Sequence, residues 1–387
     1  MKKLVLLDYY LTNKSGHHLT YDLSVVNEAV KEGIPAEILC PKGAAVSKNF
    51  LIKDELDSFT TNGKFQSIKK ILERIKEIKN TIKKYKDSLF IVQYVDKTTY
   101  FQWFFATLFN SGKNNRYAFV IRRGLGDHYK SDPLMSALLK SLISSPFIFI
   151  LKQRKDFYFL TDSELIDIDL KKRGFKRTGL LPIPHLPNVT FKASKEDVIG
   201  FFGGARYEKG YCLLPEIIDL VLKKKPKTKF VIQDYLPKIT YYNMHLDLLK
   251  ETQTKIRSLA KKYPKNIILL EGYLDDKTYN KYMDMCKILL SIYNKDLYGM
   301  GTSAILSEGI SMGKWIIVPN GTWMSYQKNK YSKISAFDNF NAKSITEAIL
   351  KIKENIPQKT LLEQISGWKK FHSAKNFIKL LRKYAFN

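Results

Sequence analysis

Short apolar runs alternate with longer amphipathic segments along most of the chain. The run KLVLLDYY at residues 3–10 is followed by the segment 19–33, in which apolar residues recur at helical spacing and which closes on Gly33. These apolar positions are Leu23, Val26, Ala29 and Val30. Strand-like runs that alternate with helical segments are typical of strand–helix–strand units built on a parallel sheet. The pattern therefore predicts an α/β fold.

The alternation stops near residue 180 and then begins again. Residues 180–197 contain three prolines within six residues, which favours a connecting segment over a helix or strand. Five strand-like runs follow: VIGFFGG, KFVIQDY, NIILLEGY, KILLSIY and KWIIVP. A chain of 387 residues is also too long for one typical core. We therefore expect two Rossmann-like domains at 1–185 and 198–365 with a Pro-rich linker at 186–197, and a closing helix at 366–387 that packs back on the first domain.

The chain carries 65 Lys and Arg against 37 Asp and Glu, a net charge of +28. This excess favours anionic partners such as phosphorylated substrates, nucleic acid or an acidic membrane surface. Cys40, Cys212 and Cys286 lie far apart and show no metal-binding spacing. The apolar start is too short for a signal peptide, and no run of about 18 apolar residues occurs. We expect a soluble cytoplasmic protein without a metal ion or cofactor.

The stretch GFFGGARYEKGYCLLPEII, residues 200–218, has the composition of an anion-binding turn. A strand-like run ends in Gly203 and Gly204, and Arg206 and Lys209 follow before a helical segment. Glycines let the backbone approach an anion closely, and the basic side chains can hold a diphosphate. The alternative is a tight turn with two solvated basic residues.

The stretch YGMGTSAILSEGISMGKWIIVPNGTWM, residues 298–324, places one acid inside a small-residue segment. The spacing predicts a helix over residues 302–312, which begins after Gly301 and whose first amides form an anion site. Glu308 lies beyond the first turn, where it gains little from the helix dipole but can reach a hydroxyl near a bound phosphate. Taken alone, this stretch favours a solvated glutamate.

Together the two stretches resemble the C-terminal half of GT-B fold glycosyltransferases, in particular the large retaining group (glycosyl transferases group 1). The family's G-x-x-x-x-E-K-G turn is matched by Gly203 and by the residues Glu208, Lys209 and Gly210. Its later helix–strand unit is matched by Thr302, Ser303, Glu308, Gly309, Gly313 and Lys314. The resemblance covers residues 198–325 and implies two Rossmann-like domains that face each other across a cleft.

The resemblance also implies roles in binding a nucleotide-sugar. Arg206 and Lys209 would contact the donor diphosphate, the backbone amides of Gly301, Thr302 and Ser303 would hold phosphate, and Glu308 would accept hydrogen bonds from the ribose. The sequence departs from the family at two positions. Met300 stands where retaining members often have a second acid, and Gly204 stands where the family usually has its arginine. The stereochemical outcome and the donor class therefore stay open.

Two stretches of the first domain could serve the acceptor side. The segment after the first strand contains Gly16, His17 and His18, which we expect in a loop where they could bind sugar hydroxyls or transfer protons. The run VIRRGLGDHYKSD ends a strand with four candidate side chains. The resemblance makes His128 a contact to the transferred sugar, with Arg122 or Arg123 supplying charge and Asp127 as a base if the reaction inverts. The alternatives are polar surface and loop capping.

Residues 65–86 form a basic amphipathic pattern. The residues on one helical face are Ile68, Ile71, Leu72, Ile75, Ile78 and Ile82, and lysines occupy much of the rest. Such a helix could lie on an anionic membrane, which would make the protein peripheral on the inner face. The alternative is a helix that covers the domain and exposes a solvated lysine face.

These observations predict a metal-independent glycosyltransferase that moves a sugar from a nucleotide-sugar to a glycan or lipid-linked acceptor, in bacterial envelope polysaccharide or lipopolysaccharide synthesis. Two alternatives remain. One is a nucleotide-sugar 2-epimerase of the same fold, and the other is a non-catalytic module that binds membrane or nucleic acid. No recognised nucleic-acid motif occurs, so nucleic acid is not the expected partner. The sugar, the nucleotide and the acceptor are not determined by the sequence.

Overall fold

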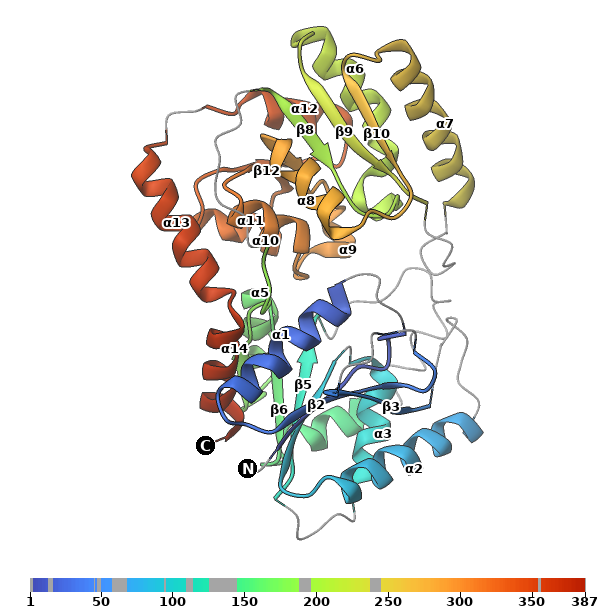
Figure 1. Cartoon of the computed structure of the whole chain (residues 1–387), viewed down its shortest axis with the longest axis vertical. Coiled ribbons are helices and arrows are strands. Elements are labelled where there is room, and N and C mark those ends of the chain that lie inside the picture. The colour runs from blue at the N-terminus through green and yellow to red at the C-terminus, as the bar shows by residue number, and fades with distance from the viewer. Residues whose placement is uncertain are drawn as a thin grey trace. The chain divides into compact units, whose positions relative to one another are not determined.

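The chain forms two compact units. The computed structural model describes residues 3–12, 17–44, 46, 50–57, 68–93, 95–108, 114–124, 145–187, 196–236, 245–353 and 356–386. The N-terminal unit comprises Met1–His185 and Phe371–Asn387, and the C-terminal unit comprises Leu186–Lys370. Each unit has its own sheet with helices packed around it (Figure 1).

The N-terminal unit is built on a seven-stranded sheet in the order β3-β2-β1-β4-β5-β6-β7. Its strands are β1 Lys3–Leu7, β2 Ala36–Pro41, β3 Ile52–Leu56, β4 Ser88–Val92, β5 Arg116–Ile121, β6 Phe157–Thr161 and β7 Thr178–Leu180. Its helices within the described residues include α1 His17–Lys31, α2 Ile68–Lys84, α3 Lys97–Thr107, α5 Glu164–Lys172 and α14 Ala374–Leu381. All neighbouring strands described pair in parallel. The strand order runs from β1 to β3 on one side of β1 and from β4 to β7 on the other, so it reverses between β1 and β4.

The two faces of this sheet carry different side chains. On one face, Leu4, Leu6 and Ile38 are buried in a cluster with residues of α1 and α14, and α14 lies beside α1 in Figure 1. Elsewhere in the sheet, aromatic rings of neighbouring strands pack against Trp103 of α3 at centroid distances of 5.4 to 6.2 Å. These rings are Phe90, Tyr117 and Phe119. The last helix of the chain thus contributes to the core of the first unit.

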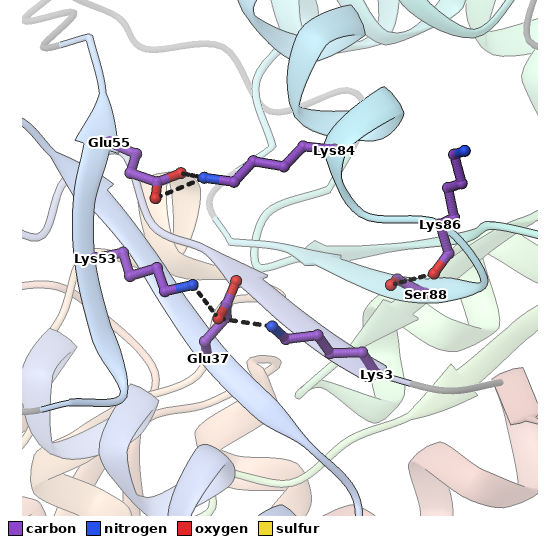
Figure 2. Close-up of polar contacts among 7 residues, drawn as sticks. All are labelled: Lys3, Glu37, Lys53, Glu55, Lys84, Lys86 and Ser88. Carbon is purple, nitrogen blue, oxygen red and sulfur yellow. Dashed lines mark hydrogen bonds and ion pairs between the residues drawn. The ribbon is translucent and has the colours of Figure 1, made fainter.

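The amino-terminal edge of the sheet carries a group of charged side chains, which Figure 2 shows. Glu37 of β2 accepts hydrogen bonds at the same carboxylate oxygen from Lys3 (2.7 Å) and Lys53 (2.8 Å). On β3, Glu55 binds Lys84 at the end of α2 with both carboxylate oxygens (2.7 and 2.6 Å). Neighbouring strands and α2 are therefore tied together by ion pairs here.

Helix α2 buries only part of the apolar face that its sequence predicts. Ile78 and Ile82 are buried, and the helix packs against α3. Ile68 and Leu72, near its start, are exposed. The prediction of a helix that covers the domain is therefore confirmed for its C-terminal half.

The C-terminal unit is built on a six-stranded parallel sheet in the order β10-β9-β8-β11-β12-β13. Its strands are β8 Val198–Phe201, β9 Lys229–Asp234, β10 Ile267–Glu271, β11 Ile288–Leu290, β12 Trp315–Pro319 and β13 Ile334–Phe337. Its longer helices are α6 Leu214–Lys224, α7 Leu246–Lys262, α8 Asp276–Met285, α10 Ala304–Ser311, α12 Ala342–Leu350 and α13 Gln358–Phe371. The strand order reverses between β8 and β11.

Close packing requires glycine at several positions of this unit, of which Gly210 and Gly309 connect separate elements. A Cβ on Gly210, which has a φ of +78°, would lie 2.5 Å from the Ile292 carbonyl oxygen. A Cβ on Gly309 would lie 2.7 Å from Leu289 Cδ1. The first contact joins the turn after β8 to the segment after β11, and the second seats α10 on the sheet.

The predicted fold of two parallel-sheet, Rossmann-like units is confirmed. The structure adds strands β3, β7 and β13, which the sequence pattern did not indicate. Within the described residues, every helix is too short or too polar to cross a membrane.

Candidate functional site

A side chain of β9 fixes the conformation of the turn after β8. Gly203 has a φ of +96°, and its amide donates to Gln233 Oε1 (2.8 Å). Gln233 Nε2 in turn donates to the Gly272 carbonyl oxygen after β10 (3.0 Å). The turn is thereby fixed to the carboxyl ends of β9 and β10. Sequence reasoning missed Gln233, a polar residue near the end of an apolar run.

Two basic side chains follow this turn. Arg206 Nε lies 3.4 Å from Glu208 Oε1. The Lys209 ammonium lies 5.5 Å from the centre of the Tyr293 ring, and a Cβ added to Gly203 would lie 3.3 Å from it. No hydrogen bond or ion pair joins this ammonium to any residue that the structure describes. Burial, together with the charge of Arg206, lowers the pKa of Lys209 to about 7.

The helix of the second motif is α10, which begins at Ala304 and ends before Gly313. Ser303 caps it, since its hydroxyl oxygen accepts from the Leu306 amide (3.3 Å). Ser303 Oγ also donates to Tyr293 Oη (3.3 Å), whose pKa burial raises to about 12. Tyr293 therefore stands between Lys209 and the start of α10, so the structure brings the two predicted motifs together.

Glu308 is buried, with 4% of its surface exposed. Its Oε2 accepts a hydrogen bond from the Tyr279 hydroxyl of α8 (2.6 Å). Burial and the adjacent Glu308 carboxylate raise the pKa of Tyr279 well above its usual value. The Tyr279 ring also packs edge-on against the ring of Phe202, at a centroid distance of 5.5 Å. Phe202 directly precedes the glycine turn. The interpretation of Glu308 as a solvated helix residue is wrong, because the helix turns this side chain inward.

Lys314, which follows α10, has a different role. It is buried and donates to the carbonyl oxygen of Asp284 at the end of α8. A carboxylate oxygen of Asp284 lies 3.5 Å from the same ammonium. Asp284 thus compensates the charge of Lys314, whereas the charge of Lys209 has no such partner within the described residues.

The N-terminal unit has a second polar group at the carboxyl ends of its strands. Asp8 follows β1 directly, and its Oδ2 lies 2.7 Å from His18 Nδ1. Arg122 follows β5, donates to Gln93 Oε1 (3.0 Å) and lies 3.6 Å from Asp162. Its guanidinium also lies 4.6 Å from the centre of the Tyr21 ring. This group holds Arg122 in place.

The structure describes only some of the N-terminal candidates. His17 and His18 begin α1, so the expected loop position is wrong, because the helix starts directly after Gly16. Arg122 is half-buried, whereas Arg123 is exposed. Gly16, Asp127 and His128 lie outside the described residues. Sequence reasoning missed Asp8 and Tyr279. Asp8 had a signal, as a lone acid at the end of an apolar run.

The fold of the chain matches solved structures across its full length. A glycosyltransferase from Rickettsia africae has 14% identity and a TM-score of 0.68, with 100% of this chain and 99% of that chain covered. HepE from Anabaena, in complex with UDP and glucose, has 11% identity and a TM-score of 0.67, with 99% of each chain covered. TarM from S. aureus, in complex with fondaparinux, α-GlcNAc-glycerol and UDP, has 14% identity and a TM-score of 0.65, with 100% of each chain covered.

No known family model matches the sequence, and no curated protein matches it closely enough to count as a relative. The structural likeness shows that the chain has the GT-B fold that its C-terminal motifs predicted.

Proposed function

We propose that this chain transfers a sugar from a nucleotide-sugar to a hydroxyl of a glycan or lipid-linked acceptor, in the synthesis of an envelope polysaccharide or lipopolysaccharide. One observation carries the proposal: the Lys209 ammonium lies at a glycine turn after a parallel strand and has no carboxylate partner within the described residues. A cation that is partly removed from water and has no paired anion is costly in a folded protein, and Lys209 is half-buried. A bound diphosphate would supply the missing negative charge.

The other side chains at this end of the sheet fit the same ligand. Ligands of open α/β sheets bind where the strand order reverses, and the turn carrying Arg206 and Lys209 follows β8 at such a point. We assign these two residues to the diphosphate, together with Gly203, Gly204 and the backbone of Gly301, Thr302 and Ser303 before α10. We assign the Glu308 carboxylate, which Tyr279 holds in place, to the ribose.

The proposed chemistry is departure of a nucleoside diphosphate. Positive groups fixed in advance around the leaving diphosphate stabilise the charge that develops on it, and this requires no reorganisation during the reaction. On the N-terminal unit we assign acceptor binding and proton transfer to Gly16, His17, His18, Arg122, Arg123, Asp127 and His128. HepE and TarM were both solved with UDP, which supports UDP as the first nucleotide to test.

The test is calorimetric titration of the whole chain with UDP, GDP, ADP and CMP. We expect one of these to bind, and we expect Lys209→Met and Glu308→Gln each to weaken it about tenfold or more, the usual effect of losing a hydrogen bond to a charged group. Lys261→Met, an exposed lysine on α7, is the matched control and should bind as the parent does. Binding of none of the four nucleotides would refute the proposal.

A second measurement separates transfer from epimerisation. After incubation of the nucleotide-sugar with the protein, NMR identifies the sugar that has been released and the sugar that is still attached to the nucleotide. A transferase releases free nucleoside diphosphate and leaves the unreacted donor with its original configuration. Appearance of the 2-epimer of the donor would favour the epimerase instead.

A further inference from the structure

Two turns at the amino ends of strands in the C-terminal sheet have the same sequence pattern. The pattern K-K-x-P-K occurs at residues 223–227 and again at 261–265, and nowhere else in the chain. The first copy joins α6 to β9 and the second joins α7 to β10. These two strands are neighbours in the sheet, and α7 packs against both α6 and β10 (Figure 1). The repeat therefore places two lysine-rich turns side by side.

Each copy forms a tight turn with proline at its second position. The Thr228 amide donates to the Lys225 carbonyl oxygen (3.0 Å), and the Asn266 amide donates to the Tyr263 carbonyl oxygen (3.0 Å). Proline fixes the backbone at the second position of a β-turn. The third positions of the two turns are therefore equivalent, and both are exposed lysines, Lys227 and Lys265.

Asn266 joins the two turns. Its side-chain amide donates to the carbonyl oxygens of Pro226 (2.8 Å) and Thr228 (2.8 Å) in the first turn. Its own carbonyl oxygen accepts from the Phe230 amide at the start of β9 (2.6 Å). These hydrogen bonds fix the spacing of the exposed lysines in and beside the turns. We refer to these lysines as the lysine patch, which consists of Lys224, Lys225, Lys227, Lys262 and Lys265.

Carboxylates compensate only part of the charge of the lysine patch. Neither turn contains an acidic residue. Asp197 lies 3.8 Å from Lys225, and the carboxylate that acts on Lys262 is Asp219 of α6. The other three lysines of the patch form no ion pair with any residue that the structure describes: Lys224, Lys227 and Lys265.

The helix dipoles do not account for the whole patch. A dipole favours lysine in the last turn of a helix, where Lys224 and Lys262 lie at the ends of α6 and α7. The other three lysines lie beyond the helices. A surface that concentrates positive charge in this way attracts an anionic partner.

The chemistry of the lysine patch favours a flat anionic surface. Lysine is a compact charge, whereas arginine serves bidentate recognition of a single phosphate, and both turns contain lysine and no arginine. Single-stranded nucleic acid also requires aromatic faces on which bases stack. Tyr263, the aromatic residue of the two turns, is half-buried against the core, and the Lys262 ammonium lies 5.0 Å from its ring centre. Phospholipid head groups therefore fit the patch better than nucleic acid does.

We propose that the lysine patch docks the protein on an anionic phospholipid surface. The choice of lipid rests on the proposed function, because a lipid-linked acceptor is presented at a membrane. The two turns precede β9 and β10, whereas the residues assigned to the diphosphate follow β8 or precede α10 at the carboxyl ends of the strands. The patch and the nucleotide residues thus lie at opposite ends of one sheet, so docking and nucleotide binding can be measured separately.

Co-sedimentation of the whole chain with vesicles tests the proposal. The vesicles contain phosphatidylcholine alone, or phosphatidylcholine and phosphatidylglycerol in equal amounts, and we expect binding only to the second kind. Added salt should weaken binding, because the Debye length falls from about 10 Å at about 0.1 M to about 3 Å at about 1 M. Replacement of four patch lysines by glutamine should weaken binding at least about tenfold. These substitutions are Lys224→Gln, Lys227→Gln, Lys262→Gln and Lys265→Gln.

The matched control removes four exposed lysines from α2, so that both variants have the same net charge. Glutamates stand between the lysines of α2, and we expect this variant to bind vesicles within about twofold of the parent. Thermal unfolding checks that both variants fold as the parent does. Equal losses in the two variants would show an effect of net charge alone, and a loss confined to the control would assign docking to α2. Either result overturns the inference. The control substitutions are Lys69→Gln, Lys70→Gln, Lys76→Gln and Lys83→Gln.

Failure of this inference is distinguishable from failure of the proposed function. If UDP or another nucleoside diphosphate binds but the phosphatidylglycerol vesicles do not, the patch is no docking surface and glycosyl transfer stands. If the vesicles bind as expected but no nucleoside diphosphate does, docking stands and glycosyl transfer fails. Binding of a single-stranded oligonucleotide without binding of vesicles would assign the patch to nucleic acid and overturn the inference.

Discussion

Lys209 and Glu308 are both charged residues set inside the C-terminal unit, and they differ in how their charge is compensated. Glu308 accepts a hydrogen bond from Tyr279. The Lys209 ammonium faces the Tyr293 ring and feels the like charge of Arg206 and the opposite charge of Glu208, but no hydrogen bond or ion pair joins it to a described residue. A strongly shifted pKa in a group of this kind is typical of functional sites. The residue whose charge is left uncompensated is therefore the best marker of where a ligand binds.

We expect Lys209→Met to change how stability depends on pH. The pKa of Lys209 is about 7 in the folded chain and 10.5 in its ordinary range, so the unfolded chain binds the extra proton between these values. Stability of the parent therefore rises with pH across that window. Thermal unfolding of both proteins, measured without nucleotide, should show the variant to be the more stable below pH 7, with the difference shrinking as the pH approaches 10.5.

Nucleotide binding should have the opposite dependence. A bound diphosphate favours the charged ammonium, so the affinity of the parent for UDP should fall as the pH rises above 7. Calorimetry of Lys209→Met should show a flatter pH profile. A parent profile that is as flat as that of the variant would mean that Lys209 does not contact the diphosphate.

At the scale of elements, the strands that the sequence pattern missed all lie at sheet edges, although one edge strand, β10, was predicted. The central strands β1, β8 and β12 are buried apolar runs, which the pattern predicted. The missed strands β3, β7 and β13 are all edge strands. The missed edge strands are short or polar, as the sequence IKDEL of β3 illustrates, whereas the predicted edge strand β10 is the apolar run IILLE. The pairing of the missed strands depends on the neighbouring strand rather than on their own sequence.

The sequence likewise predicted only part of the candidate site. The turn with Lys209 and the helix with Glu308 are local motifs, so the sequence predicted both. The partner of Glu308 is Tyr279, 29 residues away, and the support of Gly203 is Gln233, 30 residues away. These contacts exist only after the sheet brings α8 and β9 beside the motifs. Asp8 and His18 likewise meet only because α1 turns back over the end of β1.

The ion pairs at the amino-terminal edge give a prediction for β2. Glu37→Gln should destabilise the N-terminal unit by about 1 kcal/mol at pH 7, because the buried Glu37 carboxylate accepts from the two partly exposed lysines Lys3 and Lys53 (Figure 2). Hydrogen bonds from the two lysines hold the pKa of Glu37 below its usual value against the effect of burial. The stabilisation is therefore present above the unfolded pKa of about 4.3 and is lost as the pH falls through the lower folded value.

Denaturant unfolding at neutral and acidic pH measures this effect. Glu55→Gln is the matched control, since Glu55 pairs with the single, more exposed Lys84. It should cost less than Glu37→Gln at neutral pH. Equal costs for the two variants, or a cost for Glu37→Gln that persists below the folded pKa, would contradict the argument.

At the scale of the whole molecule, the chain builds its N-terminal unit from two separate pieces. Residues of α14 are fully buried among those of α1 and β1, although more than three hundred residues separate them in the sequence. The Arg382 guanidinium also pairs with Glu32 at the end of α1 (2.9 Å). The N-terminal unit is therefore completed only when the last helix has been made, whereas the C-terminal unit is contiguous.

This arrangement predicts that a destabilising substitution in α14 lowers the stability of the N-terminal unit and leaves that of the C-terminal unit unchanged. Phe377 is fully buried and packs edge-on against Tyr21 of α1 (5.9 Å), so Phe377→Ala should cost about 3–5 kcal/mol, as large cavities do. Hydrogen exchange followed by mass spectrometry should show faster exchange in Met1–His185 and little change in Leu186–Lys370. UDP affinity should be retained, because the residues assigned to the nucleotide all lie in the C-terminal unit.

Leu362→Ala, at an exposed position of α13, serves as the control. Faster exchange in both units to the same extent would mean that they unfold as one cooperative body, and the C-terminal unit would then not be an independent nucleotide-binding module.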